Sequence, residues 1–184
     1  EGLRLIETNL SRACELIRTF KQVSTNETSV QTETVELESY LHDIVESLGE
    51  TLENCPHRVE IATDPDKTEL DLEPVSLAEV VKSLVLNAAT HAYRDNGHHE
   101  GVITLSVESA SQCTHIVVRD DGCGISATNL PRIFEPFFTT SSEMAQPGLG
   151  LNIAHNLVTQ RLGGTIECHS EVGKGTEFVI SIPS

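Results

Sequence analysis

Residues 114–124 read THIVVRDDGCG, an alternating strand pattern that runs directly into a turn of aspartate and glycine. A second glycine cluster, GLGL, occupies residues 148–151, and a short aromatic segment separates the two clusters. Asn87 precedes both clusters on an apolar helical pattern. Glycine lets a backbone pass close to a ligand. Each cluster alone suggests only a tight turn, but the ordered set predicts a nucleotide pocket with a flexible cover.

The flanking sequence predicts an alternating series of helices and strands. Strands 102–107 and 114–119 form a hairpin, and helix 74–93 carries Pro74 near its first turn. The other predicted elements are helix 37–52, strand 58–63, helix 149–162 before Gly163-Gly164, and closing strands 165–169 and 176–182. The simplest architecture for this order is an α+β fold, a two-layer sandwich in which helices cover one face of a mixed β-sheet.

The net charge limits the function classes. Against 12 lysines and arginines the 184 residues contain 28 aspartates and glutamates, a formal charge of −16. Such a surface repels nucleic acid and anionic membranes, so we expect no DNA-binding role. It also repels ATP. A nucleotide site must therefore attract phosphates locally, through Mg²⁺, helix N-termini and oriented backbone amides.

The five cysteines are widely spaced and form no metal-ligand cluster, so we expect free thiols in a reducing cytosol. No apolar run approaches the roughly 20 residues that span a bilayer, which predicts a soluble cytoplasmic domain. The chain begins without Met and inside a helical pattern, so we expect it to belong to a longer protein, with membrane anchoring of that protein left open.

The first residues carry an apolar repeat at alternating steps of three and four, typical of a coiled coil or helix bundle. Its members are Leu3, Ile6, Leu10, Ala13, Ile17 and Phe20. An amphipathic helix lying on its own domain is the alternative, since the repeat lasts only about three heptads. The polar stretch from Ser24 to Thr34 reads as a linker.

Four blocks resemble the ATP-binding catalytic domain of bacterial sensor histidine kinases. This family belongs to the superfamily of Bergerat-fold ATPases that includes DNA gyrase, MutL and the ninety-kilodalton heat-shock chaperone. The blocks are an asparagine box at 79–88 (EVVKSLVLNA), a first glycine box at 120–124 (DDGCG), an aromatic box at 133–140 (IFEPFFTT) and a second glycine box at 148–151 (GLGL). The closing motifs GGT at 163–165 and GKGTEF at 173–178 also match. The resemblance implies three parts: the end of a dimerisation and phosphoacceptor hairpin at 1–24, a linker at 25–36 and the catalytic domain at 37–184.

By this resemblance Asn87 is the catalytic residue that holds Mg²⁺. Its amide oxygen is a hard ligand suited to a metal that bridges phosphates. The alternative is an asparagine that satisfies a neighbouring backbone group. Glu79, two turns earlier, is expected to help through a water.

The resemblance assigns the adenine to the first glycine box. Asp120 is the expected adenine reader, because an ionised carboxylate can only accept the hydrogen bond of the exocyclic amine. Gly122 and Gly124 let the chain run flat against the base, and Ile125 and Phe137 wall it. Asp121 is expected only to shape the turn, and Cys123 only to fill space.

The phosphates are assigned to the second glycine box. Residues Thr139 to Pro147 match the ATP lid. After the lid, Gly148, Leu149, Gly150 and Leu151 open a helix whose backbone amides can bind phosphate. These four residues and Thr176 of the closing motif are expected to bind the nucleotide.

Several positions depart from the family pattern. Ser83 replaces the glutamate that activates water in gyrase-type ATPases, which argues against efficient hydrolysis. The lid carries no lysine or arginine, Gln146-Pro147 stiffens one hinge, and Thr90 stands where many relatives carry a phosphate-binding lysine. His91 has two open interpretations, a phosphate contact or a helix-end histidine. Arg94, Arg132 and Lys174 are looser phosphate candidates.

The functional hypothesis is transfer of the ATP γ-phosphate to a histidine on the dimerisation hairpin, in two-component signalling. The expected partners are this hairpin, a response regulator receiver domain and a second copy of the chain bound through the N-terminal helix. The accepting histidine is expected outside residues 1–184, because His42-Asp43 lacks the surrounding pattern. A regulatory module without phosphotransfer and an ATPase of the gyrase or MutL type remain alternatives.

Overall fold

The computed structural model describes residues 31–52, 55, 57–63, 69–93, 101–110, 112–140 and 148–184. The predicted N-terminal helix and most of the predicted lid lie outside these residues. The elements in chain order are β1 (Glu33–Glu36), α2 (Leu37–Ser47), α3 (Gly49–Leu52), β2 (Arg58–Thr63), β3 (Glu69–Leu72), α4 (Pro74–His91), β4 (Val102–Ala110), β5 (Cys113–Asp120), the 3₁₀ turn η1 (Leu130–Arg132), α5 (Gly150–Gln160), β6 (Thr165–Glu171) and β7 (Gly175–Pro183).

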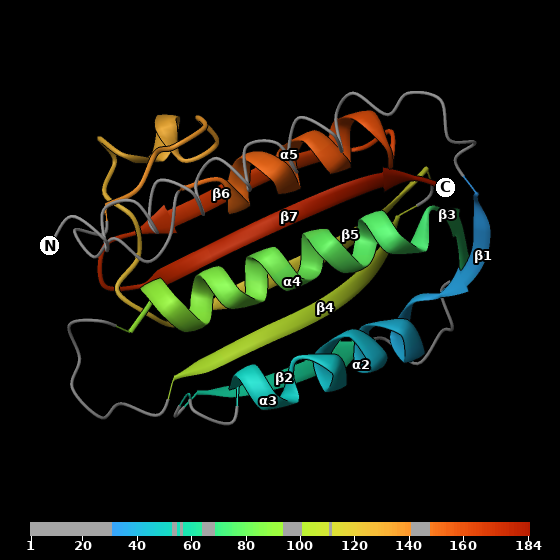
Figure 1. Cartoon of the computed structure of the whole chain (residues 1–184), viewed down its shortest axis with the longest axis horizontal. Coiled ribbons are helices and arrows are strands. Elements are labelled where there is room, and N and C mark those ends of the chain that lie inside the picture. Colours follow the sequence, from blue (N-terminus) through green and yellow to red (C-terminus); the bar gives the residue numbers. More distant parts are fainter. Residues whose placement is uncertain are drawn as a thin grey trace, which may run out of the picture.

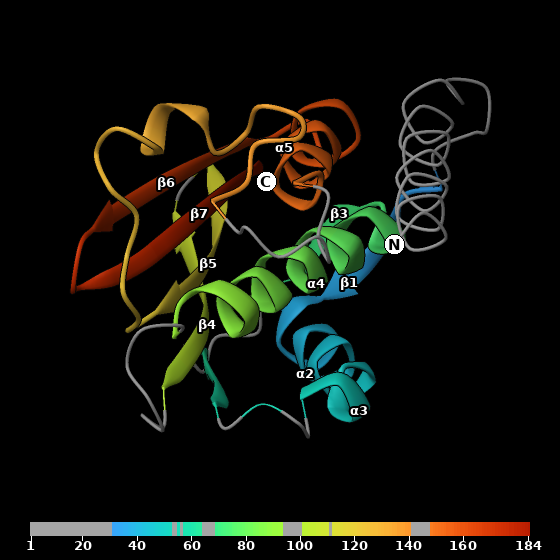
Figure 2. The same ribbon diagram turned by 60° about the vertical axis from the view of Figure 1, so that its left-hand side comes forward.

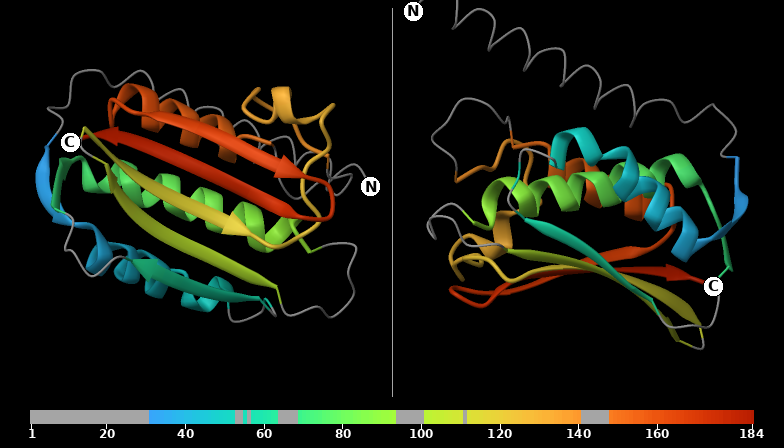
Figure 3. Two further views of the ribbon diagram at one scale, coloured as in Figure 1. Left: turned by 180° about the vertical axis from the view of Figure 1, so that it is seen from behind. Right: turned by 90° about the horizontal axis from the view of Figure 1, so that it is seen from below.

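A five-stranded mixed sheet forms one layer of the molecule. The strand order is β2-β4-β5-β7-β6; β2 runs parallel to β4 and the other neighbours are antiparallel. Helices α2, α4 and α5 cover one face, with α4 between the other two (Figure 1), and the view from below separates the helix layer from the sheet (Figure 3). The predicted α+β two-layer sandwich is confirmed.

Helix α4 is the centre of the core. Its side chains at Leu77, Val80, Val81, Leu84 and Val85 have no exposed surface. This apolar band is wider than a surface helix needs, because α4 packs on the sheet and has α2 and α5 beside it. The polar positions that remain on α4 are therefore few.

Two predicted elements need correction. Helix 37–52 is interrupted, because the backbone of Leu48 leaves the helix (ψ −3°) and Gly49, a poor helix former, follows it. The last residues of the predicted linker form strand β1, which pairs antiparallel with β3. Neither strand was predicted from the sequence, because each has only four residues.

Candidate functional site

Asp120 ends strand β5 on the face of the sheet that the helices cover. Side chains alternate along a strand, so Ile116, Val118 and Asp120 share this face. Asp120 lies opposite Thr176 of β7. Only 5% of Asp120 is exposed. Its carboxylate therefore lies at the rim of the hydrophobic core.

Backbone donors hold this carboxylate in place. Gly122 N and Thr176 N donate to its Oδ1 at 3.0 and 3.2 Å. Burial raises the pKa of Asp120 because it disfavours the charged form, and the two backbone hydrogen bonds only partly oppose this. Oδ2 takes neither backbone bond, so it remains able to accept from a ligand amine.

The first glycine box packs against the end of α4. Cys123 N donates to Ala92 O at 2.7 Å, and the Cys123 Sγ lies 3.7 Å from the carbonyl oxygen of His91. A Cβ on Gly122 would lie 2.3 Å from Ala92 O. Gly122 is therefore required for the contact between this turn and α4, a role that sequence analysis did not foresee.

Substituting Gly122 by alanine should destabilise the fold by about 1–3 kcal/mol, because the new methyl group meets backbone that cannot move aside. Gly49→Ala is the matched control, since nothing lies within 4 Å of its Cβ position. Chemical denaturation of both variants checks this. Equal midpoints for the two would contradict the packing role of Gly122.

The turn between β6 and β7 closes onto the first glycine box. Gly124 and Gly175 have left-handed backbone, with φ of +70° and +92°. A Cβ on Gly124 would lie 2.2 Å from Glu171 O, and one on Gly175 would lie 2.0 Å from Asp120 O. Gly173 N also donates to Cys123 O at 2.8 Å. These contacts make the turn and the glycine box one rigid unit.

The aromatic segment meets the second glycine box at the base of the predicted lid. Figure 2 shows the chain that follows β5, coloured yellow to orange, passing through the η1 turn before it runs toward α5. A Cβ on Gly148 (φ +71°) would lie 2.6 Å from Phe138 O. Phe137 is half exposed and has a left-handed φ of 66°, which is strained for a bulky residue. Thr139 is exposed just beyond it, and Gln146-Pro147 lies outside the described residues.

The start of α5 offers backbone N–H groups. Leu149 occupies the N-cap position, and no side chain caps the helix. Leu149 is buried and Leu151 half-buried, so both also anchor the helix. A Cβ on Gly150 would lie 3.0 Å from Ser83 Oγ. The helix therefore starts beside α4, one turn before Asn87, where its amides suit an anion.

Asn87 is half-buried on α4. Within the part of the chain that the structure describes, its side-chain amide has no hydrogen-bond partner. This disfavours an asparagine that satisfies a neighbouring backbone group. An amide oxygen that accepts no hydrogen bond can coordinate Mg²⁺, so Asn87 fits the predicted role of metal ligand.

Glu79 does not lie near Asn87. Helix α4 is continuous between them, and a rise of 1.5 Å per residue separates them by about 12 Å along the axis. One water bridges about 5–6 Å between polar atoms. The predicted help from Glu79 through a water is therefore inconsistent with the geometry.

The cationic candidates also differ in placement. His91 is the last residue of α4, half-buried beside the first glycine box, and both of its interpretations stay open. Arg132 pairs with Glu135 at 3.1 Å, and Lys174 pairs with Glu171 at 2.8 Å. Arg94 lies outside the described residues.

Asp121 does more than shape the turn. Its Oδ1 accepts hydrogen bonds from Val102 N at 2.9 Å and from the Tyr93 hydroxyl at 3.0 Å. The ring of His57 stacks on Tyr93 with centroids 3.9 Å apart. Asp121 thereby ties the end of β5 to the start of β4 and the end of α4. The partners lie 19 and 28 residues away, so no local pattern reveals them.

Cys168 lies inside the sheet near the site. Burial, and secondly the charge of Asp120, raise the pKa of its thiol to about 12. The thiol therefore stays protonated at neutral pH. All four described cysteines are free, as predicted; Cys14 lies outside the described residues.

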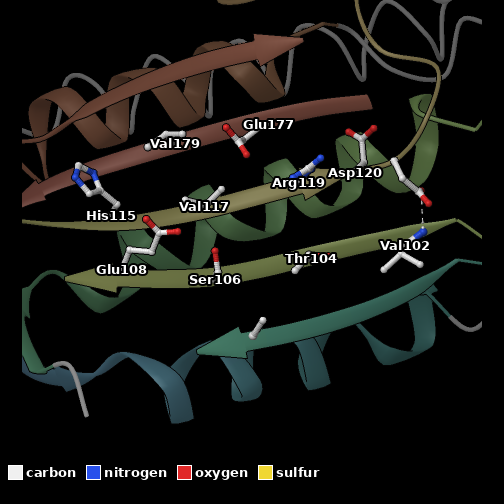
Figure 4. Close-up of a pocket in the computed structure, with 12 residues that line it drawn as sticks. Val102, Thr104, Ser106, Glu108, His115, Val117, Arg119, Asp120, Glu177 and Val179 are labelled. Carbon is white, nitrogen blue, oxygen red and sulfur yellow. Dashed lines mark hydrogen bonds between the residues drawn. The ribbon is translucent and has the colours of Figure 1, made fainter. Parts of the chain in front are cut away.

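A groove of about 610 Å³ lies on the opposite face of the sheet, away from the helices. Figure 4 shows the side chains of Val102, Thr104, Ser106 and Glu108 on β4 and of His115, Val117 and Arg119 on β5 along this face. It touches the predicted site only at Asp120 and Asp121. The groove is therefore distinct from the pocket that the glycine boxes predict.

Among the described residues, no three histidine, cysteine, aspartate or glutamate side chains come together as metal ligands. None of the helices formed by this part of the chain is both long and apolar enough to cross a membrane.

Residues 73–184 match the family described as histidine kinase-, DNA gyrase B- and HSP90-like ATPases. Among curated proteins, sensor histidine kinase ZraS of Escherichia coli K12 is 31% identical over 156 residues, which cover 85% of this chain and 32% of ZraS. The chain thus spans about a third of the length of this relative.

Solved structures share the fold. Histidine kinase ThkA, in complex with the response regulator protein TrrA, superposes with a TM-score of 0.74 at 21% identity, covering 99% of this chain and 50% of ThkA. Full-length ShkA in complex with AMPPNP superposes with a TM-score of 0.80 at 21% identity, covering 99% of this chain and 37% of ShkA. The sheet and its helix layer are therefore those of histidine kinase catalytic domains.

Proposed function

Because this chain belongs to the family of histidine kinase-, DNA gyrase B- and HSP90-like ATPases, we propose that it binds Mg²⁺-ATP and presents the γ-phosphate to a histidine on a dimerisation hairpin. The observation that carries the nucleotide assignment is the buried Asp120 carboxylate. Two backbone N–H groups donate to its Oδ1, and its Oδ2 remains available to accept from a ligand. The relative ZraS is a sensor histidine kinase, which supports the kinase assignment.

In this proposal different residues bind the adenine and the phosphates of the nucleotide. Asp120 accepts the adenine amine, with Thr176 beside it, while Gly122, Gly124, Ile125 and Phe137 line the base. The start of α5, from Gly148 to Leu151, donates backbone N–H groups to the phosphates, and Thr139 lies where the lid begins. These groups place the phosphate and balance its charge, and they do so without covalent chemistry.

Asn87 would hold the magnesium ion, which neutralises phosphate charge when bound. Its amide lies on α4 one turn after Ser83, which lies against the start of α5. The two helices thus bring the metal ligand and the phosphate amides to the same end of the site. The local attraction demanded by the charge of −16 is met in this way.

Ser83 favours a kinase over an ATPase of the gyrase or MutL type. Its hydroxyl is a much weaker base than a carboxylate, so it does not activate water at neutral pH. A Cβ on Gly150 would lie 3.0 Å from Ser83 Oγ, so the start of α5 lies directly against this hydroxyl. We infer slow hydrolysis and transfer to a protein acceptor.

The partners follow from this function. We propose a dimerisation hairpin with its histidine, a response regulator receiver domain as the next acceptor, and a homodimer formed through residues 1–24. ThkA, which shares the fold, was solved with a response regulator protein. The domain would work in the cytoplasm, where ATP is available, whether or not the whole protein is membrane-anchored.

The test adds a matched dimerisation hairpin to the 184-residue chain with Mg²⁺ and γ-labelled ATP. Label on a hairpin histidine is the expected result, with none on the chain alone. Binding of ATP without labelling of the hairpin would instead favour a regulatory module, and rapid ATP hydrolysis that depends on Ser83 would favour a gyrase-type ATPase.

A further inference from the structure

Ser170 of β6 joins three parts of the adenine site. Alternation along β6 turns Ser170 inward, on the face that carries Ile166 and Cys168. Its Oγ accepts a hydrogen bond from Ile125 N at 2.8 Å and donates to Gly175 O at 2.8 Å. It also lies 3.1 Å from Thr176 Oγ1. One hydroxyl thus contacts the first glycine box, the β6–β7 turn and the start of β7.

The partners of Ser170 are the groups that hold Asp120. Thr176 donates its backbone N–H to Asp120 Oδ1 at 3.2 Å. A Cβ on Gly175 would lie 2.0 Å from Asp120 O, so this residue presses on the backbone of Asp120. Ser170 therefore contacts Thr176, which binds the side chain of Asp120, and Gly175, which packs against the backbone of Asp120.

The single hydroxyl proton of Ser170 fixes the direction of these bonds. Ser170 donates it to Gly175 O, so the proton in the contact with Thr176 comes from Thr176 Oγ1, and Ser170 Oγ accepts it together with the bond from Ile125 N. This bond fixes the rotamer of Thr176, whose backbone N–H donates to Asp120 Oδ1. Ser170 thus holds in place the residue that supports the ionised Asp120 carboxylate.

We propose that Ser170 is a positioning residue for adenine recognition, which fixes Asp120, Thr176 and Ile125 as one unit. The proposal rests on the nucleotide-binding function given above. It assigns Ser170 to discrimination between a purine with an amine at carbon 6 and one with a carbonyl there. A site that hydrogen-bonds a substrate amine loses discrimination when its acceptor is free to turn.

The experiment measures dissociation constants of the 184-residue chain for ATP and for inosine triphosphate by calorimetry. Ser170→Ala should weaken ATP about five- to ten-fold and inosine triphosphate less than two-fold, so that the ratio of the two constants falls. Ser170→Thr keeps the hydroxyl and should restore the ratio. Ser181→Ala is the matched control, a β7 serine whose hydroxyl contacts His115 on the far face.

Each outcome is informative. An unchanged ratio in Ser170→Ala, including equal weakening of both nucleotides, overturns the positioning role. Should Ser170→Ala not fold, Ser170→Cys, of similar volume but a weak donor, carries the same comparison. Failure of the unmodified chain to bind ATP overturns the proposed function as well, and is thereby distinguished from failure of the Ser170 inference alone.

Discussion

Replacing Asp120 by asparagine should raise the dissociation constant of the chain for ATP at least about a hundred-fold. The Oδ1 of asparagine can keep the bonds from Gly122 N and Thr176 N, which leaves Nδ2 at the position of the carboxylate Oδ2. A donor then faces the adenine amine, which is also a donor. The variant is nearly isosteric, so its affinity reports recognition and not loss of fold.

Calorimetry with ATP measures this effect, and thermal unfolding confirms that the variant is folded. Asp71→Asn is the matched control, because Asp71 is exposed on β3 and its carboxylate accepts a hydrogen bond from the Thr34 hydroxyl. An ATP affinity of Asp120→Asn within about three-fold of the unmodified chain would remove Asp120 from the adenine site.

The same variant gives a pH prediction. The pKa of Asp120 is raised in the folded chain, so the folded state holds this proton more tightly than the unfolded state does. The resulting stabilisation is complete below the ordinary value of 3.8 and is lost as the pH rises through the raised pKa. As the pH rises from 3.8 through the raised pKa, the melting temperature of the unmodified chain should therefore fall relative to that of Asp120→Asn. A pH-independent difference would contradict the raised pKa.

Replacing Asn87 by alanine should slow phosphotransfer to a matched hairpin on the order of a thousand-fold. The substitution removes an amide oxygen that has no hydrogen-bond partner among the described residues, so it should change stability by less than about 1 kcal/mol. The adenine contacts are untouched, and binding of ADP in the presence of a chelator should be nearly unchanged. The loss is therefore expected only where magnesium is required.

Initial rates of hairpin labelling at several Mg²⁺ concentrations measure this effect. Asn156→Ala on α5 is the control, since Asn156 Nδ2 donates a hydrogen bond to Asn152 Oδ1 at 3.4 Å. Labelling that persists in Asn87→Ala with an unchanged dependence on Mg²⁺ would exclude Asn87 as the metal ligand.

The architecture was predictable because its strong signals are local. Alternation along 114–119 predicted the strand that runs into Asp120, and the pattern of 74–93 predicted the helix that the structure shows as α4. The short strands β1 and β3 were not predictable, because four residues of mixed polarity carry little periodicity and their pairing joins segments over thirty residues apart.

A close backbone approach at the glycines was predictable, because a glycine pair beside an aspartate is typical of one. The predicted partner of Gly122 and Gly124 was the adenine, whereas the contacts in the structure are with Ala92 O and Glu171 O. The roles of Asp121 and Ser170 were hidden, because their partners come from distant strands and a serine in a strand carries no distinctive signal. The distance between Glu79 and Asn87 follows from the rise per residue of the continuous helix α4, and it is too long for one bridging water.

The most direct test of the proposed kinase activity is label transfer from γ-labelled Mg²⁺-ATP to the histidine of a matched dimerisation hairpin, catalysed by this chain. We expect acid-labile phosphate on that histidine, dependent on both Asp120 and Asn87. A chain that binds Mg²⁺-ATP with Asp120 and Asn87 intact, yet leaves the hairpin unlabelled, would contradict it.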